Sequence, residues 1–113
     1  MVDEESMEDA EIAVIAYGSV ARSARRAVRE ARSRGIRAGL LQLITLWPFP
    51  RQILTPHLRR IRAVLVPELN MGQVSREVKR INQGLTRVET INRIDGGLIS
   101  PEEILTALVK LQP

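Results

Sequence analysis

Four short apolar segments recur along the chain, and each is followed by a segment with helical periodicity. The apolar segments are IAVIAY, AGLLQLITL, AVLVPEL and VETINRI, at residues 12–17, 38–46, 63–69 and 88–94. Apolar runs of this length are typical of strands that are buried on both faces. Because strands that alternate with helices form right-handed βαβ units, the sequence predicts an α/β fold: a three-layer α/β/α sandwich with a mostly parallel sheet of four strands.

The helical segments carry recognisable ends. Ser19 is the predicted N-cap of a helix whose small apolar residues share one face and whose arginines share the other, and Gly35 ends this helix. A short helix is expected over residues 52–60, and a third ends at Gly84. Residues 100–103, Ser-Pro-Glu-Glu, form a capping box that starts the last helix.

If the four predicted strands are numbered in chain order, their expected order across the sheet is 2-1-3-4. This order reverses beside the first strand. In sheets of this kind ligands bind at the carboxyl ends of the strands, at the point where the order reverses. The turn after the first strand and the loop after the third strand meet there, so we expect one crevice or interface at this place. Its candidate residues are Gly18, Ser19, Arg22, Glu68, Asn70, Gly72 and Gln73.

Two interpretations stay open for most of these residues. Phosphate-binding loops need several glycines, and here Gly18 stands alone, so a plain helix start is favoured over an anion site at Ser19 and Arg22. Glu68 either neutralises a helix N-terminus or faces a ligand or a neighbouring domain. The rings of Trp47 and Phe49, in LWPFP, either cover the core of this domain or contact another domain.

Composition excludes several classes of function. The 113 residues suffice for one domain, and the absence of cysteine excludes disulfides, iron–sulfur clusters and cysteine nucleophiles. A single histidine, His57, argues against a zinc site built on histidines. Three observations argue against nucleic-acid binding. Fifteen of the 17 basic residues are arginines that are spread over several segments, and the net charge is only +4. The three aromatic residues are too few to form a platform on which bases could stack.

The amino-terminal residues 1–10 are acidic and lack periodicity. We interpret them as a linker or an expression remnant, and residues 11–113 as the folded domain. No apolar run approaches the ~20 residues that span a bilayer, and the acidic start does not resemble a secretory signal. We therefore expect a cytoplasmic protein that does not bind membranes.

Four motifs carry a resemblance to a known family. AYGSVARSARRAV, LLQLITLWPFP, AVLVPELNMGQVSREVKR and INRIDGGLISPEEI, in this order, closely resemble the C-terminal domain of the alpha subunit of 2-oxoacid:ferredoxin oxidoreductases, especially the 2-oxoglutarate type. The resemblance extends over about residues 10–110 and implies a transketolase C-terminal-like fold. In that fold an antiparallel edge strand precedes the first strand found here. Because residues 1–10 are too short and too acidic to predict it, we expect a fragment of a longer subunit that self-associates through an uncovered sheet edge.

The resemblance also implies a reaction whose parts lie outside this chain. Enzymes of the family decarboxylate a 2-oxoacid with thiamine diphosphate and Mg²⁺, pass electrons through iron–sulfur clusters to ferredoxin, and form an acyl-coenzyme A. The G-D-G and N-N diphosphate-binding pattern and all cluster cysteines are absent here. We therefore expect no catalytic, metal or cofactor-binding residues, and an assembly domain that contacts other domains of its subunit and the beta subunit. The alternative is a stand-alone regulatory module that binds a small anion at Gly18 and Ser19.

Overall fold

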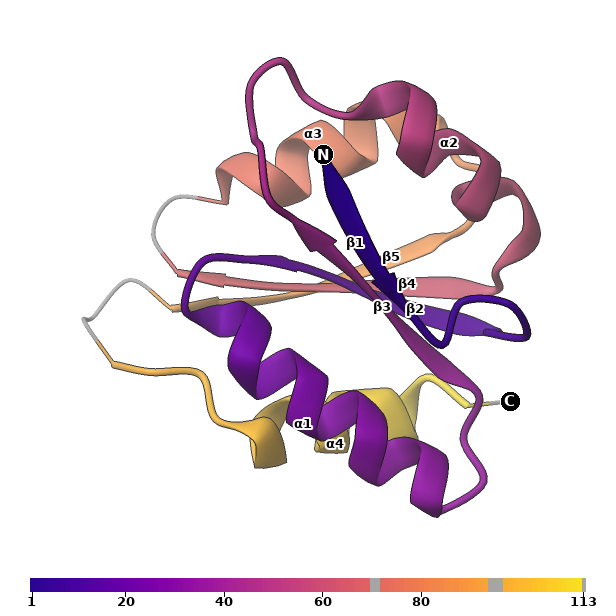
Figure 1. Ribbon diagram of the computed structural model, residues 1–113, viewed down its shortest axis with the longest axis vertical. Helices are drawn as coiled ribbons and strands as arrows, with labels where there is room; N and C mark the ends of the chain where they lie inside the picture. Colours follow the sequence, from indigo (N-terminus) through magenta and orange to yellow (C-terminus); the bar gives the residue numbers. More distant parts are fainter. Residues whose placement is uncertain (70–71, 94–96, 113) are drawn as a thin grey trace.

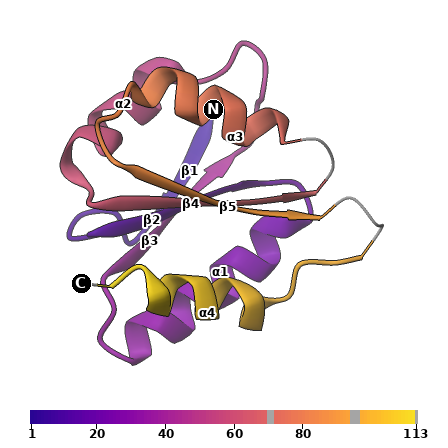
Figure 2. The same ribbon diagram turned by 180° about the vertical axis from the view of Figure 1, so that it is seen from behind.

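A five-stranded sheet lies between two layers of helices (Figure 1). The computed structural model describes residues 1–69, 72–93 and 97–112. Helices α1 and α4 cover one face of the sheet and α2 and α3 cover the other, as the view from behind also shows (Figure 2). The elements in chain order are β1 (Val2–Glu5), β2 (Ile12–Tyr17), α1 (Val20–Ser33), β3 (Ala38–Leu43), α2 (Arg51–Arg60), β4 (Ala63–Leu69), α3 (Gln73–Asn82), β5 (Arg87–Arg93) and α4 (Pro101–Lys110).

The four predicted strands form the parallel part of the sheet. The strand order is β1-β3-β2-β4-β5, so the predicted order of the four strands and their parallel direction are confirmed. The central strand β2 pairs with β3 and β4, with Ile12 opposite both Ala38 and Ala63. The strand order therefore reverses beside β2, and the carboxyl ends of β2 and β4 lie at the same edge.

The prediction of only four strands, with one edge uncovered, was wrong. Residues Val2–Glu5 form β1, which pairs antiparallel with β3 and places Val2 opposite Leu43 and Glu5 opposite Leu40. This strand therefore covers the edge of β3 through which we expected self-association. Its sequence, VDEE, has no apolar alternation, so its place in the sheet depends on charged side chains and backbone pairing.

Contacts from both helical layers hold β1, because successive side chains of a strand point to opposite faces. On one face the Glu5 carboxylate accepts hydrogen bonds from Arg25 at 3.2 Å and from Arg29 at 2.9 Å, both on α1. The hydrogen bond from Arg29 is the main cause that lowers the pKa of Glu5 below its ordinary value. On the other face Glu4 lies 3.0 Å from Nε2 of His57 on α2.

The connection between β1 and β2 packs directly on the sheet. The Met7 side chain is 2% exposed and belongs to the apolar core on the α2–α3 side. A Cβ atom at Gly39 in β3 would lie only 2.4 Å from Sδ of Met7 and 2.9 Å from the backbone oxygen of Ser6, so this close approach requires glycine. Arg32 donates a hydrogen bond to the Ser6 carbonyl at 2.7 Å. Residues 1–10 are therefore part of the fold, and their interpretation as a linker was wrong.

Helix ends follow the sequence signals with one exception. The capping box of α4 is confirmed, since the Glu103 N–H donates to Oγ of Ser100 and the Ser100 N–H donates to the Glu103 carboxylate. Ser19 occupies the N-cap position of α1, but its backbone is already helical and its hydroxyl caps no N–H group. Strand β3 ends at Leu43, earlier than predicted, and the Ile44 N–H instead donates to the Met1 carbonyl at 2.9 Å.

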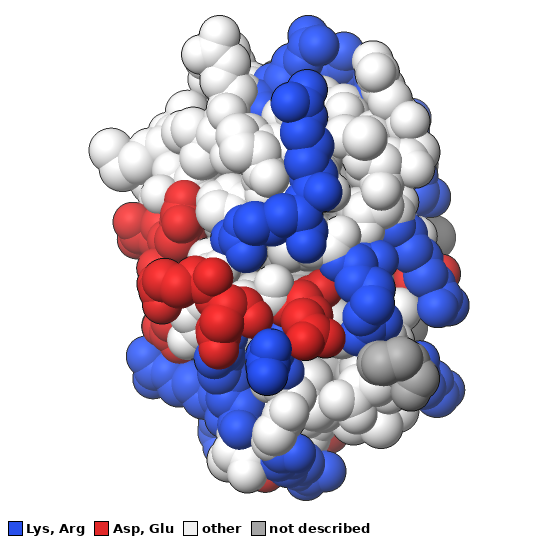
Figure 3. All heavy atoms as spheres, turned by 90° about the vertical axis from the view of Figure 1, so that its right-hand side faces the viewer, with Lys and Arg blue, Asp and Glu red and all other residues white. Residues whose placement is uncertain are grey.

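Acidic and basic side chains are mixed on the face at the amino ends of the parallel strands (Figure 3). Glu11 contacts Arg37 at 3.3 Å and Arg62 at 3.9 Å there. Arg37 and Arg62, which directly precede β3 and β4, therefore both have an acidic neighbour on this face.

Candidate functional site

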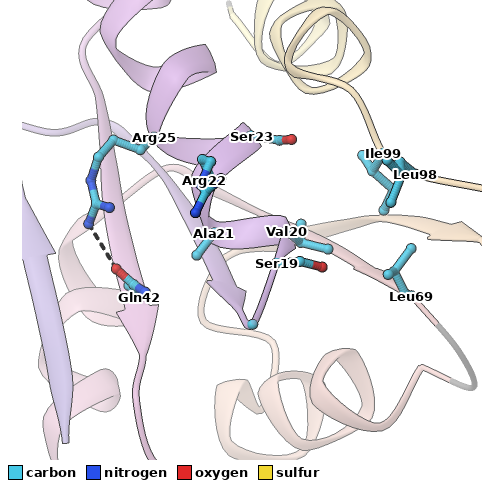
Figure 4. Close-up of a pocket in the computed structure, with 11 residues that line it drawn as sticks. Ser19, Val20, Ala21, Arg22, Ser23, Arg25, Gln42, Leu69, Leu98 and Ile99 are labelled. Atoms are coloured by element: carbon cyan, nitrogen blue, oxygen red, sulfur yellow. Dashed lines mark hydrogen bonds between the residues drawn. The ribbon is translucent and has the colours of Figure 1, made fainter.

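A crevice of about 510 Å³ lies where β2 ends and α1 begins (Figure 4). Gly18 has φ +65°, a backbone conformation that favours glycine, and it turns the chain from β2 into α1. Leu69, at the end of β4, lies on the opposite side, so the predicted meeting of the first turn with the end of the third predicted strand is observed. The crevice is lined by Gly18, Ser19, Val20, Ala21, Arg22, Ser23, Arg25, Gln42, Leu69, Leu98 and Ile99.

Glu68, in contrast, does not line the crevice. Its side chain is 3% exposed, and its carboxylate accepts hydrogen bonds from the N–H groups of Val74 at 3.0 Å and Ser75 at 2.8 Å. These are the first N–H groups of α3, which have no partner within the helix. Glu68 therefore neutralises a helix N-terminus, which is the structural one of its two interpretations.

The rest of the predicted loop starts α3. Gly72 is the N-cap residue, with φ +77°, and a Cβ atom there would lie 3.0 Å from Nδ2 of Asn92. Gln73 is the first residue of the helix and is exposed. Asn70 lies outside the described residues. The predicted set is thus divided: Gly18, Ser19 and Arg22 line the crevice, whereas Glu68 and Gly72 shape the start of α3.

Trp47 and Phe49 have different environments, although their ring centroids are only 6.3 Å apart. Phe49 packs against the core on the α2–α3 side, whereas Trp47 is 62% exposed. Both rings and Leu46 line a shallow depression together with Gln73, Val74 and Glu77 of α3. The LWPFP segment and the start of α3 therefore form one surface, and of its two rings only Phe49 clearly serves the domain's own core.

Sequence reasoning missed part of the crevice. Arg25 and Gln42 lie on one side of it and are joined by a 2.8 Å hydrogen bond (Figure 4). Leu98 and Ile99, which precede α4, form the opposite side. No local signal distinguishes Leu98, which is 77% exposed, from its neighbour Ile99, which is 3% exposed in the same loop.

The donor set of the crevice does not fit a magnesium diphosphate group. Mg²⁺ takes oxygen ligands, chiefly carboxylates, yet none of the described residues that line the crevice is Asp or Glu, and the oxygen of Gln42 accepts a bond from Arg25. Among residues 1–69, 72–93 and 97–112, no three His, Cys, Asp or Glu side chains are grouped so that they could hold a metal ion. In the same ranges, no helix combines the length and the apolar composition needed to cross a membrane.

Comparison with family models gives a match over residues 10–104, to the pyruvate:ferredoxin oxidoreductase core domain II. The chain belongs to this family. Among curated relatives of this core domain II, the 2-oxoglutarate synthase subunit KorA of Methanothermobacter thermautotrophicus is 44% identical over 97% of the chain. The ketoisovalerate oxidoreductase subunit VorB of Methanothermobacter marburgensis is 39% identical over 91% of the chain. The chain spans 29% of the length of each of these two relatives.

Solved structures show the same fold as this core domain II. A 2-oxoglutarate:ferredoxin oxidoreductase from Magnetococcus marinus matches 98% of the chain and 19% of its own, with a TM-score of 0.84 and 24% identity. A split-gene transketolase matches 96% of the chain and 41% of its own, with a TM-score of 0.78 and 16% identity. The expected likeness to the 2-oxoacid:ferredoxin oxidoreductase family and to transketolase is confirmed.

Proposed function

We propose that this chain is a non-catalytic assembly domain of the alpha subunit of a thiamine-diphosphate-dependent 2-oxoacid:ferredoxin oxidoreductase. The parent enzyme oxidatively decarboxylates a 2-oxoacid, of which 2-oxoglutarate is the best-supported candidate, and forms an acyl-coenzyme A while ferredoxin is reduced. Membership in the core domain II family and the names of the curated relatives support this assignment. Thiamine diphosphate, Mg²⁺ and iron–sulfur clusters are then held by other domains and subunits in the cytoplasm.

The exposed apolar surface around Trp47 is the observation that carries the proposal. We call it the Trp47 face: Met1, Ile44, Trp47, Pro48 and Ile53. Trp47 is 62% exposed, Met1 70% and Ile44 49%. Met1, Pro48 and Ile53 line one hollow, and the backbone of Met1 binds that of Ile44. Phe49 lines both this hollow and the depression that Trp47 lines, so the two lie next to each other. Exposed apolar patches of this kind mark protein–protein interfaces, and because the match spans only 29% of the length of the KorA relative, most of such a subunit is left to cover it.

The proposed role is tested by placing Trp47→Ala in the full-length alpha subunit. Trp47 is the only tryptophan of the chain, and its ring is large enough to act as an interface anchor, whose loss weakens binding by at least ~2 kcal/mol, or about 30-fold. We expect less assembled enzyme at a given subunit concentration by analytical ultracentrifugation, with the fold of the domain unchanged by circular dichroism. Leu85→Ala is the matched control, because Leu85 is 50% exposed but lies in the loop before β5. Equal assembly of wild type and Trp47→Ala enzyme contradicts the proposed interface.

A further inference from the structure

The arginines of α1 differ in whether an acidic residue neutralises them. Arg25 and Arg29 bind the Glu5 carboxylate, and Arg32 binds Asp9 at 2.7 Å. Arg22 has no ionic or hydrogen-bonded partner among the described residues, and its side chain lies at the crevice (Figure 4). Among the described residues Arg22 is therefore a cation without an acidic partner, whereas three of the five arginines of α1 are paired.

The described residues that line the crevice carry only one sign of charge. They include Arg22 and Arg25 and no Asp or Glu, and the first turn of α1 carries no acidic residue. The amino end of a helix adds a partial positive charge of its own. The crevice is thus complementary to a carboxylate.

An apolar wall faces these cations. Leu98 is 77% exposed, the most exposed of the large apolar side chains that the structure describes, and it lies beside Ile99 across the crevice from Arg22 and Ser19 (Figure 4). Leu69 continues this wall at the end of β4. A free inorganic anion would leave Leu98 in water, whereas a protein segment can cover Leu98 and neutralise Arg22 together.

We propose that the crevice binds an acidic segment of the alpha subunit that lies outside this chain. A carboxylate of that segment pairs with Arg22 at the start of α1, and an adjoining apolar side chain packs on Leu98. This inference rests on the proposed function, because the subunit must supply the segment, and the 29% share of the relatives' length leaves ample polypeptide to do so. It adds a second interface, because the crevice lies beside α1 and the Trp47 face beside α2 (Figure 1).

Hydrogen–deuterium exchange with mass spectrometry tests the proposal on the chain alone and on the same residues in the assembled enzyme. We expect the amides of residues 19–22 and 97–99 to exchange about tenfold more slowly in the assembled enzyme. The substitution Arg22→Glu should make these amides exchange at least threefold faster in the assembled enzyme than they do without the substitution. The reason is that it replaces an attraction between opposite charges by a repulsion between like charges. Arg22→Lys should keep most of the protection. Arg59→Glu, at an exposed arginine of α2, is the matched control and should leave residues 97–99 unchanged.

The outcomes separate this inference from the proposed function. Protection of residues 44–49 without protection of residues 19–22 and 97–99 overturns the acidic segment and leaves the assembly role intact. No protection at either surface overturns both. A third outcome is that inorganic phosphate alone slows exchange of these amides in the isolated chain as much as assembly does, and that Arg22→Glu abolishes this effect. That outcome also overturns the proposal and favours the small-anion module instead.

Discussion

The substitution Gly39→Ala tests whether residues 1–10 are part of the folded domain. The added Cβ atom would lie 2.4 Å from Sδ of Met7, 2.9 Å from the Ser6 backbone oxygen and 3.0 Å from Cβ of Ala10. The side chain of Met7 can shift, but the Ser6 oxygen is backbone, so the connection must move away from β3. Overpacking of this kind costs about 1–3 kcal/mol of stability. Alanine also lowers the conformational entropy of the unfolded chain, which stabilises the folded state by up to ~1 kcal/mol and offsets part of this cost.

We therefore expect the free energy of unfolding to fall by about 1–2 kcal/mol, measured by urea denaturation followed by circular dichroism. Tm should fall by roughly 4–16 °C, given a shift of about 4–8 °C per kcal/mol in a domain of similar size. The alternate amides of residues 40–43 that point toward β1 should exchange faster, because β1 separates with the connection.

A double-mutant cycle identifies the contact responsible. Met7→Ala alone should cost about 2 kcal/mol or more, because it leaves a cavity in the core on the α2–α3 side. In that background Gly39→Ala should cost at least ~1 kcal/mol less than in the wild type, since the nearest atom is gone while the Ser6 oxygen remains. A Gly39→Ala variant as stable as the wild type, with unchanged exchange at residues 40–43, would refute the close packing of this segment.

Two further predictions concern buried and paired carboxylates. Glu68→Gln should lower the free energy of unfolding by about 1–3 kcal/mol in urea denaturation, because an amide has one acceptor oxygen where the two carboxylate oxygens accept two N–H bonds from α3. The control Glu77→Gln, on the surface of α3, should change the free energy of unfolding by less than ~1 kcal/mol. Equal effects of the two substitutions would argue against the capping role of Glu68. For Glu5, the folded-state pKa is below the unfolded value, so the unfolded chain binds more protons and stability decreases as the pH falls through the acid range below ~4.3. Thermal melts should show that Glu5→Gln flattens this acid-side decrease, and an unchanged pH profile would contradict the Glu5–Arg29 contact.

The parallel strands could be predicted because their signals are local. Each is a continuous apolar run next to a helical segment, and the chirality of βαβ units then leaves few arrangements. The capping box at Ser100 is also a local signal. The same reasoning placed Gly18 and Ser19 near the end of β4, where the crevice is found.

Strand β1 could not be predicted because its contacts are distant in sequence. Glu5 binds arginines 20 and 24 residues away, and Glu4 contacts a histidine 53 residues away. An acidic segment without alternation carries no strand signal until these partners are placed. Gly39 did carry a signal, since an isolated glycine inside an apolar strand indicates a close approach of another backbone.

The candidate site was predicted in position but not in composition. The alternative roles of Glu68 depended on whether the first N–H groups of α3 point back toward β4, which only the three-dimensional structure shows. Leu98 joins the crevice because α4 packs beside α1, and this contact has no signature in either helix alone.

Hydroxyl-radical footprinting of Trp47 tests the central claim, that this chain is an assembly domain, most directly. Mass spectrometry assigns the oxidation to this residue whatever other tryptophans the enzyme contains. The account predicts fast oxidation of Trp47 in the isolated chain, where its side chain is exposed, and at least about tenfold slower oxidation in the assembled enzyme. Equal oxidation rates in the two samples would contradict it.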